Sequence, residues 1–225
     1  MQNLQTNNSV VLVGKICTEF VFSHEVYYEK FYNFSLDIAR LSGVSDIIII
    51  TASEQLTYGK NFKPGDNVYI IGQFRSYNNY TDVGNKLKLT VFAKEILPAE
   101  QCERLCDIET EDEAKRCINE INLIGFICKQ PVYRTTPFGR EITDLLVAVN
   151  RTYNKSDYIP CIAWGRNSKF AGSLQVGDKV AIKGRIQSRE YQKKICEDET
   201  VTKTAYEVSI SKISLESDPE PAECI

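Results

Sequence analysis

The sequence predicts an all-β protein that consists of two tandem copies of a small five-stranded domain. The first observation is an internal repeat, because four segments of the first half recur in the same order about 111 residues later. The second is that short runs rich in β-branched and aromatic residues divide each copy into strands. The third is an apolar fraction of 43% over 225 residues, which supports packed cores rather than disorder.

The repeat consists of four pairs of matching segments. Residues 11–16 match 122–127, 36–40 match 147–151, 64–68 match 176–180, and 91–96 match 208–213. Four matches in one order indicate a duplicated domain of about 100 residues, which is an ordinary domain size. We therefore expect a first domain at residues 1–98 and a second at residues 119–213.

Each copy is predicted to contain five strands. They are 9–16, 31–40, 47–52, 67–77 and 86–96 in the first copy, and 120–128, 140–151, 157–165, 179–191 and 202–213 in the second. The alternation is clearest in the fourth strand of the second copy, where apolar side chains such as Ile182 share one parity and basic ones such as Lys183 share the other. That strand is predicted to have one apolar face and one basic face.

A short helix is predicted between the third and fourth strands of the second copy. Residues 167–174 are long enough for it, and Gly177 follows in a turn. Five short strands with a helix between the third and fourth form the layout of the OB-fold, a small barrel that binds oligonucleotides or oligosaccharides. The sequence thus predicts two tandem five-stranded OB-fold barrels, each with a short helix between strands 3 and 4.

Two polar segments flank the second copy. The linker at residues 99–118 is acidic, and residues 110–113 resemble a capping box that leads into a helical stretch at 114–116. The tail at residues 214–225 is acidic and has too little apolar content to pack.

The net charge of −3 argues against a protein that coats nucleic acid through bulk positive charge, but its distribution is uneven. Residues 1–100 hold 9 basic and 10 acidic side chains, whereas residues 118–213 hold 15 and 10, a balance of +5. The linker segment 101–117 has a balance of −3 and the tail −4. Only the second copy is cationic, which points to it as the part that would bind a polyanion.

Aromatic residues lie among the cations of the second copy. Tyr153 follows the second strand, Tyr158 and Trp164 share one parity of the third strand, and Tyr191 ends the fourth. The residues between Tyr158 and Trp164 that have the opposite parity are smaller, so these two aromatic side chains are predicted to point outward. Cations that contact phosphates and flat side chains that stack on bases are the two features of single-stranded nucleic-acid binding.

Five segments of the second copy resemble the bacterial and phage single-stranded DNA-binding protein family. They are Gly-Arg-Glu-Ile at 139–142, Val-Ala-Val-Asn-Arg at 147–151, Ile-Ala-Trp-Gly at 162–165, Val-Gly-Asp-Lys-Val at 176–180 and Ile-Lys-Gly-Arg-Ile at 182–186. In that family an aromatic residue followed by Gly ends the third strand, and a Gly-Asp or Gly-Ser turn leads into the fourth. The resemblance covers residues 119–213 well and residues 8–97 more weakly.

The resemblance implies a set of site residues. The four family positions at which aromatic side chains stack on bases fall on Tyr153, Tyr158, Trp164 and Tyr191. The candidate phosphate contacts are Arg140, Arg151, Lys183, Arg185 and Arg189, with Lys193 and Lys194 just beyond. In the first copy the corresponding positions are Ser42, Ala52 and Asn79, with Tyr77 and Tyr80 as partial substitutes, and a basic family position on the third strand is Pro160.

The resemblance also implies partners and a role. The expected ligand is single-stranded DNA, bound without sequence preference while unwound strands are covered in replication, recombination or repair. Because the family assembles four OB-folds per particle, two per chain suggest a homodimer. The second copy is expected to bind DNA and the first to support assembly or a weaker contact. The tail is a candidate contact for a replication or repair protein.

Other classes of protein find little support in the sequence. The start of the chain has no apolar stretch typical of a signal peptide, so a cytoplasmic location is expected. No nucleotide-binding, hydrolase or metalloprotease motif is present, and His24 lies between Ser23 and Glu25 in what is predicted to be a solvated loop. Eight scattered cysteines without a CxxC pair favour thiols over a zinc site, and no cofactor, metal or enzymatic activity is expected.

Two alternative functions stay open on this evidence. One is a primosome-type accessory protein of the same fold, which binds DNA but acts by contacting a helicase loader. The other is a protein-interaction scaffold whose two barrels have lost nucleic-acid binding.

Overall fold

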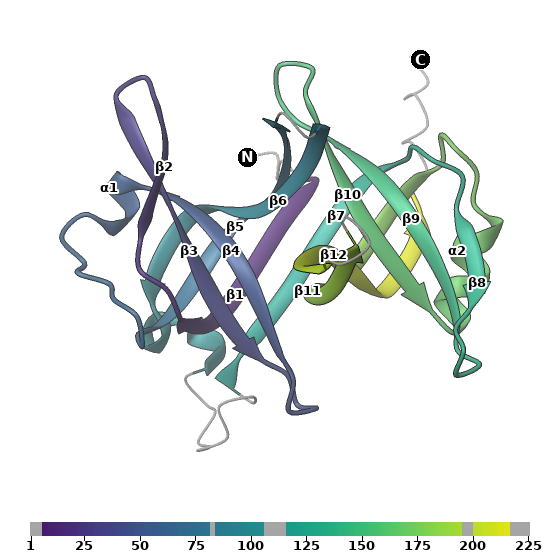
Figure 1. The fold of residues 1–225 in the computed structure, drawn as a ribbon, viewed down its shortest axis with the longest axis horizontal. Helices are drawn as coiled ribbons and strands as arrows, with labels where there is room; N and C mark the ends of the chain where they lie inside the picture. Colours follow the sequence, from purple (N-terminus) through teal and green to yellow (C-terminus); the bar gives the residue numbers. More distant parts are fainter. Residues whose placement is uncertain (1–5, 82–83, 106–115, 195–199, 217–225) are drawn as a thin grey trace, which may run out of the picture.

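The chain folds into two β-barrels that share one continuous 12-stranded sheet (Figure 1). The computed structural model describes residues 6–81, 84–105, 116–194 and 200–216, and the side chains of 79–86 and 193–200 are not described. The strand order β2-β3-β4-β6-β5-β1-β7-β11-β12-β10-β9-β8 places the first six strands in one half and the last six in the other. The all-β class and the two tandem OB-folds predicted from the sequence are confirmed.

The first barrel contains five long strands and a short helix. The strands are β1 (Asn8–Ile16), β3 (Glu29–Ala39), β4 (Ser45–Ser53), β5 (Asn67–Thr81) and β6 (Gly84–Pro98), and α1 (Glu54–Thr57) lies between β4 and β5. The parallel pair β4–β6 and the antiparallel pair β1–β3 close the sheet on itself. Fully buried apolar side chains such as Leu12, Ile50 and Phe74 fill its interior.

The second barrel repeats this arrangement. Its strands are β7 (Ile118–Ile127), β9 (Glu141–Asn150), β10 (Ser156–Trp164), β11 (Lys179–Lys194) and β12 (Thr200–Leu215), with α2 (Arg166–Ser173) between β10 and β11. The parallel pair β10–β12 and the antiparallel pair β7–β9 close it. The helix predicted at 167–174 is confirmed within one residue at each end.

Each barrel carries an additional strand that the sequence analysis missed. The strand β2 (Val21–Val26) pairs with β3, and β8 (Val132–Thr135) pairs with β9, so that the two form the outer edges of the sheet. Both strands are almost entirely exposed. They therefore lack the alternation of buried and exposed positions from which a strand is recognised in a sequence. His24 lies in β2 and not in the predicted loop.

The duplication also appears in the closest backbone approaches. A Cβ atom on Gly14 would collide with the carbonyl oxygen of Asp37, and a Cβ atom on Gly125 would collide with that of Ala148. These contacts occur where β1 meets β3 and where β7 meets β9, at positions 111 residues apart. Glycine is needed there because only a residue without a side chain lets the barrel close.

The two barrels meet across a pseudo-twofold axis. β1 pairs with β7 in antiparallel register, and Val10 faces its own repeat equivalent, Ile121. The pairing is therefore unchanged when the two barrels are exchanged. Because β1 and β7 are also barrel strands, the junction between the domains is part of the sheet itself rather than a flexible hinge.

Hydrogen bonds on both sides of this axis repeat the symmetry. Asp157 Oδ1 accepts a hydrogen bond from the Ser76 backbone N–H at 2.7 Å, and Asp46 Oδ1 accepts one from the Ser188 backbone N–H at 2.9 Å. The two hydroxyls accept in return, Ser76 Oγ from the Tyr158 N–H at 2.8 Å and Ser188 Oγ from the Ile47 N–H at 2.9 Å. These two reciprocal pairs link each barrel to the long hairpin of the other.

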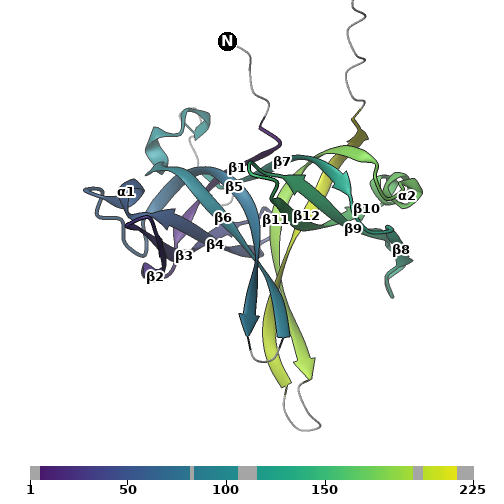
Figure 2. The ribbon, with the colours of Figure 1, turned by 90° about the horizontal axis from the view of Figure 1, so that it is seen from above.

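Both long hairpins, β5–β6 and β11–β12, project from the same side of the molecule (Figure 2). Between the barrels the described part of the linker forms two 3₁₀ turns, η1 (Ala99–Gln101) and η2 (Glu103–Leu105). The predicted helix at 110–116 lies mostly outside the described residues, as does most of the tail at 214–225. None of the described helices is long and apolar enough to cross a membrane.

Candidate nucleic-acid interface

The third strand of the second barrel, β10, presents two aromatic side chains to solvent. Ile159, Cys161 and Ala163 are buried in the barrel, while Tyr158 is 46% exposed and Trp164 is 37% exposed. The predicted outward orientation of the two aromatics is therefore confirmed. Trp164 lies six positions beyond Tyr158 along the strand, which corresponds to about 20 Å, so one base cannot reach both.

The other two predicted stacking residues lie at different points of the second barrel. Tyr153 is in the turn between β9 and β10 with φ +61° and is 93% exposed. Tyr191 is on the β11 arm opposite Lys203 and is 39% exposed. The four aromatic side chains are thus accessible, and they come from β10, from the turn before it and from the β11 arm.

The basic candidates fall into three groups. Arg185, Arg189 and Tyr191 share one parity of β11 beyond the bulge at Lys183/Gly184, and Ile186 of the opposite parity is buried in the barrel. Arg189 is exposed and lies opposite Ala205, whereas Arg185 is partly buried. Arg189 and Tyr191 therefore combine a cation and a ring on one face of β11.

Arg140 and Lys183 are exposed at other positions. Arg140 ends the turn before β9, next to Glu141, whose carbonyl accepts a hydrogen bond from the Gly165 N–H at 3.0 Å. This contact places Arg140 at the Trp164 end of the face. Lys183 precedes the bulge on β11 and pairs with Asn122 of β7.

Arg151 lies at the junction of the two barrels. Its Nε atom is 3.4 Å from Oδ2 of the fully buried Asp157, but the two atoms do not form a hydrogen bond. Burial raises the pKa of Asp157, and the hydrogen bond from Ser76 and the charge of Arg151 oppose that shift. The charge of Arg151 is thus only partly balanced by Asp157. Arg151 lies near Tyr158, whose backbone N–H donates to Ser76 Oγ in the same hydrogen-bond network.

The second barrel also carries charges that the sequence analysis did not place. Arg134 of β8 donates from Nε to Asp144 Oδ2 at 2.7 Å, and Glu207 Oε1 accepts from Gln187 Nε2 at 2.6 Å. Arg134 was missed because β8 itself was missed. The ion pair with Arg134 balances the charge of Asp144, whereas Glu207 carries a negative charge that would repel a phosphate.

The first barrel has a different set of groups on the equivalent face. The strand register aligns Trp164 with Ser53, because Trp164 pairs with Ile142 and Ser53 pairs with Phe31. The prediction that Ala52 is the counterpart of Trp164 is therefore wrong, and Ala52 is buried in the barrel. Tyr77 is exposed, whereas the side chains of Asn79 and Tyr80 are outside the described residues.

Aromatic rings are nevertheless present on this face of the first barrel. His24 stacks on Phe31 with ring centroids 4.9 Å apart and planes within 8°, and Phe31 contacts Phe92 at 5.5 Å. The Arg75 guanidinium lies 4.0 Å from the centroid of the Phe92 ring. These residues could not be predicted from the repeat, because none of them is at a position where the second copy has an aromatic side chain.

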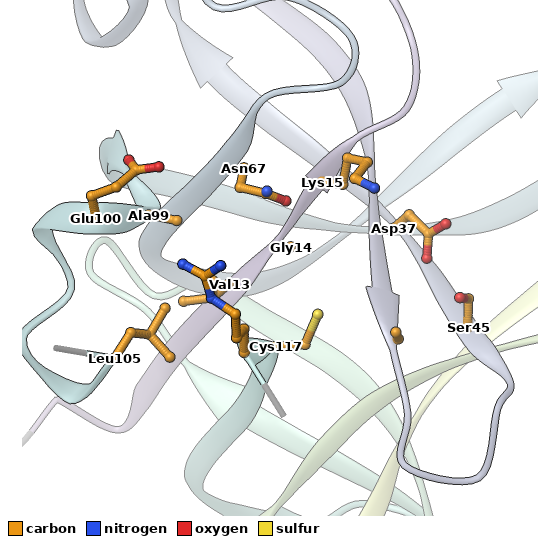
Figure 3. A pocket seen from close by; sticks show the side chains of 12 residues that line it. Val13, Gly14, Lys15, Asp37, Ser45, Asn67, Ala99, Glu100, Leu105 and Cys117 are labelled. Carbon is orange, nitrogen blue, oxygen red and sulfur yellow. The ribbon is translucent and has the colours of Figure 1, made fainter. Parts of the chain in front are cut away.

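A separate cavity of about 210 Å³ lies where β1, β3 and the 3₁₀ turns meet (Figure 3). Lys15, Asp37 and Glu100 are among its lining side chains, and no aromatic residue lines it. Within the described ranges no group of three His, Cys, Asp or Glu residues is arranged to hold a metal ion. This cavity offers no ring on which a base could stack, and it is not part of the aromatic face.

Comparison with known proteins gives a consistent result. Residues 118–215 match the model of the Single-strand binding protein family. Single-stranded DNA-binding protein 1 of Staphylococcus aureus is 34% identical over 82 residues, which cover 33% of this chain and 49% of that protein. The chain spans about half the length of the curated relatives it matches.

Solved structures extend the comparison to the first barrel. The wild-type single-stranded DNA binding protein from Thermus aquaticus has the same fold, with a TM-score of 0.72 over 96% of each chain at 18% identity. The N-terminal domain of PriB protein from Thermoanaerobacter tencongensis is 50% identical over 41% of this chain and 96% of that chain, with a TM-score of 0.37. The second barrel, which carries the outward aromatic side chains, is therefore similar to the single-strand binding protein family over residues 118–215.

Proposed function

We propose that the protein binds single-stranded DNA without sequence preference and covers unwound strands during replication, recombination or repair. The observation that carries this proposal is the outward placement of Tyr158 and Trp164 on β10, within the segment that matches the family model. A rigid barrel strand holds both rings in fixed positions, so little side-chain entropy is lost when a base stacks on them.

Binding takes place in two physical steps. Cations such as Arg189 attract the phosphates, and the release of counterions makes this step weaker as salt rises. Unpaired bases then stack on Tyr153, Tyr158, Trp164 and Tyr191, at about 1–3 kcal/mol per base. Neither step reads the identity of a base, because every base has a π-face and every nucleotide has a phosphate.

The wider setting of this activity is also part of the proposal. The protein acts in the cytoplasm, which agrees with the five described cysteines carrying thiols and no disulfide. It forms a homodimer that brings four OB-folds together. Contact with a replication or repair protein through residues 217–225 stays a prediction, because these residues lie outside the described structure.

Tryptophan fluorescence tests the proposal directly, because Trp164 is the only tryptophan of the chain. Titration with oligo-dT is expected to quench its emission as thymine stacks on the indole ring. A double-stranded oligonucleotide of the same length is the control, since its bases are already stacked on each other. Unchanged emission with oligo-dT, together with no gel shift, would overturn the proposal.

A further inference from the structure

A cleft of about 540 Å³ lies on the first barrel beside the junction with the second. Strands β2, β4, β5 and β6 line it, and the second barrel contributes Arg151. Its lining contains the cations Arg75 and Arg151. It also contains the rings of His24, Tyr77 and Phe92. The cleft is thus large enough for a nucleotide and contains both kinds of group that recognise one.

The two guanidinium groups have unused hydrogen-bonding capacity. Arg75 donates from Nη2 to Gln73 Oε1 at 2.9 Å, but its Nε atom is buried and has no hydrogen-bond partner. The buried Nε atom of Arg151 lies 3.4 Å from Asp157 Oδ2 in an ion pair, but the two atoms do not form a hydrogen bond. Buried donors are nearly always satisfied in folded proteins, so the Nε atom of Arg75, which has no partner, points to a missing acceptor in the cleft.

The electrostatics of the cleft indicate an anionic acceptor. The pKa of Arg75 is lowered, first by burial and then by the positive charge of Arg151, and Asp157 opposes this only in part. Two cations that repel each other are stabilised when an anion lies between them. A phosphodiester group carries one negative charge and two acceptor oxygens, which suits two guanidinium groups.

Rings continue from the cleft toward the outer edge of the sheet. The Arg75 guanidinium lies over Phe92, and the buried Phe31 connects that ring to the exposed His24 on β2. Tyr77 adds an exposed ring on β5. A nucleotide whose phosphate lies at Arg75 therefore has aromatic surface within reach for its base.

The second barrel does not repeat this cleft. The strand registers align Arg75 with Gln187 and Phe92 with Ser209, and Thr90 is aligned with Glu207. Gln187 donates to Glu207 there, so that a carboxylate occupies the region where the first barrel has Arg75 over a ring. The cleft is consequently a property of the first repeat and not of the duplicated fold.

We propose that this cleft is a nucleotide subsite, in which a DNA phosphate lies between Arg75 and Arg151 and the adjoining base contacts Phe92 or Tyr77. The proposal rests on the single-stranded DNA binding proposed above. It makes the first barrel a direct contact of the strand, through residues that have no equivalent in the second.

The first test replaces Arg75 with Gln, the residue that the second barrel has at the equivalent position. We expect the log–log slope of oligo-dT affinity against salt to become less steep by about 0.7, the value for one phosphate contact on a single strand. Affinity at low salt is expected to fall roughly tenfold, as for the loss of a hydrogen bond to a charged group. Arg104→Gln is the matched control, because Arg104 pairs with Glu120 and does not line the cleft.

The second test is ultraviolet crosslinking of oligo-dT to the wild-type protein, followed by mass spectrometry of the peptides. Crosslinks to peptides that contain Tyr77 or Phe92 are expected, with a loss of those at position 92 in Phe92→Leu. An unchanged salt slope in Arg75→Gln, with crosslinks confined to the second barrel, would overturn the subsite. Quenching of Trp164 in wild-type protein and in Arg75→Gln alike would then leave the general DNA-binding proposal standing, whereas absence of quenching in both would remove that as well.

Discussion

The proposed stacking of a base on Trp164 can be tested most directly by substitution. It lies at the end of β10 with about a third of its surface open to solvent, so its replacement is not expected to unfold the barrel. Trp164→Ala should weaken binding of a fluorescein-labelled oligo-dT by about 1–3 kcal/mol, measured by anisotropy. Trp164→Phe should retain most of the affinity because it keeps an aromatic face.

A matched control for this experiment is Tyr58→Ala. Tyr58 is an exposed aromatic residue beyond α1 and lies outside the face that contains Trp164. Its loss should leave the affinity unchanged. An equal effect of both alanine variants would show that the measured change does not come from stacking on Trp164.

Asp157 gives the junction a dependence on pH. Burial raises its pKa in the native state above the value of about 3.9 expected for an unfolded chain, so the native state binds this proton more tightly. The contribution of Asp157 to stability therefore falls as pH rises from about 4 through the raised native pKa. Asp157→Asn removes this titration and retains an oxygen that can accept the hydrogen bond from Ser76.

Urea unfolding of the wild type and Asp157→Asn across pH 4 to 8 checks this prediction. The difference in unfolding free energy should shift in favour of the variant as pH rises through the lower part of that window, and then become constant. Comparison of the two proteins cancels the titration of other carboxyl groups, including Glu120, whose pKa Arg104 lowers. A difference that is independent of pH would contradict the assignment.

At the scale of elements, the turn between β2 and β3 is held in an unfavourable conformation. Tyr27 and Tyr28 both have positive φ, 49° and 65°, and both are 96% exposed. Such a turn normally contains Asn-Gly, because side chains with a Cβ atom are strained there. The double variant Tyr27→Asn/Tyr28→Gly should therefore unfold about 2–4 °C higher, equivalent to about 1 kcal/mol for a chain of this size.

The control for the turn keeps the Cβ atoms and removes only the rings. Tyr27→Ala/Tyr28→Ala retains the strain of positive φ, so it should show no such gain in thermal unfolding. A similar rise in both variants would mean that the rings, and not the backbone, destabilise the hairpin.

The elements also show what a sequence can and cannot reveal. The ten barrel strands were predictable because buried and exposed residues alternate in them, as Ile182 and Lys183 illustrate. The helix α2 was predictable from the length of the segment before the turn at Gly177. The edge strands β2 and β8 were not, since almost all of their side chains are exposed and therefore show no alternation of buried and exposed positions. The outward orientation of Trp164 followed from parity alone, whereas the cleft at Arg75 depends on strand pairings between distant segments and on Arg151 from the other barrel.

At the scale of the whole molecule, the assembly state is the main prediction. Light scattering of the full chain should give twice its mass of 25.6 kDa, because two chains supply four OB-folds. The internal pairing of β1 with β7 is already satisfied within one chain, so the predicted interface must use other surfaces. A mass of one chain at concentrations well above those used for binding would refute the homodimer.

The pairing of Val10 with Ile121 places the two barrels about a pseudo-twofold axis, and this has a consequence for the orientation of a bound strand. When two identical chains meet on a twofold axis, each substitution appears in both, and the two halves stay the same. Covalent linkage removes that constraint, and Arg75 and Gln187 show that the halves have diverged at aligned positions. A DNA strand has a 5′ and a 3′ end, so a strand bound as proposed would meet the contacts of the two barrels in a different order in each of its two orientations. The duplication has thus given a symmetric framework a polarity that a symmetric pair of chains cannot have.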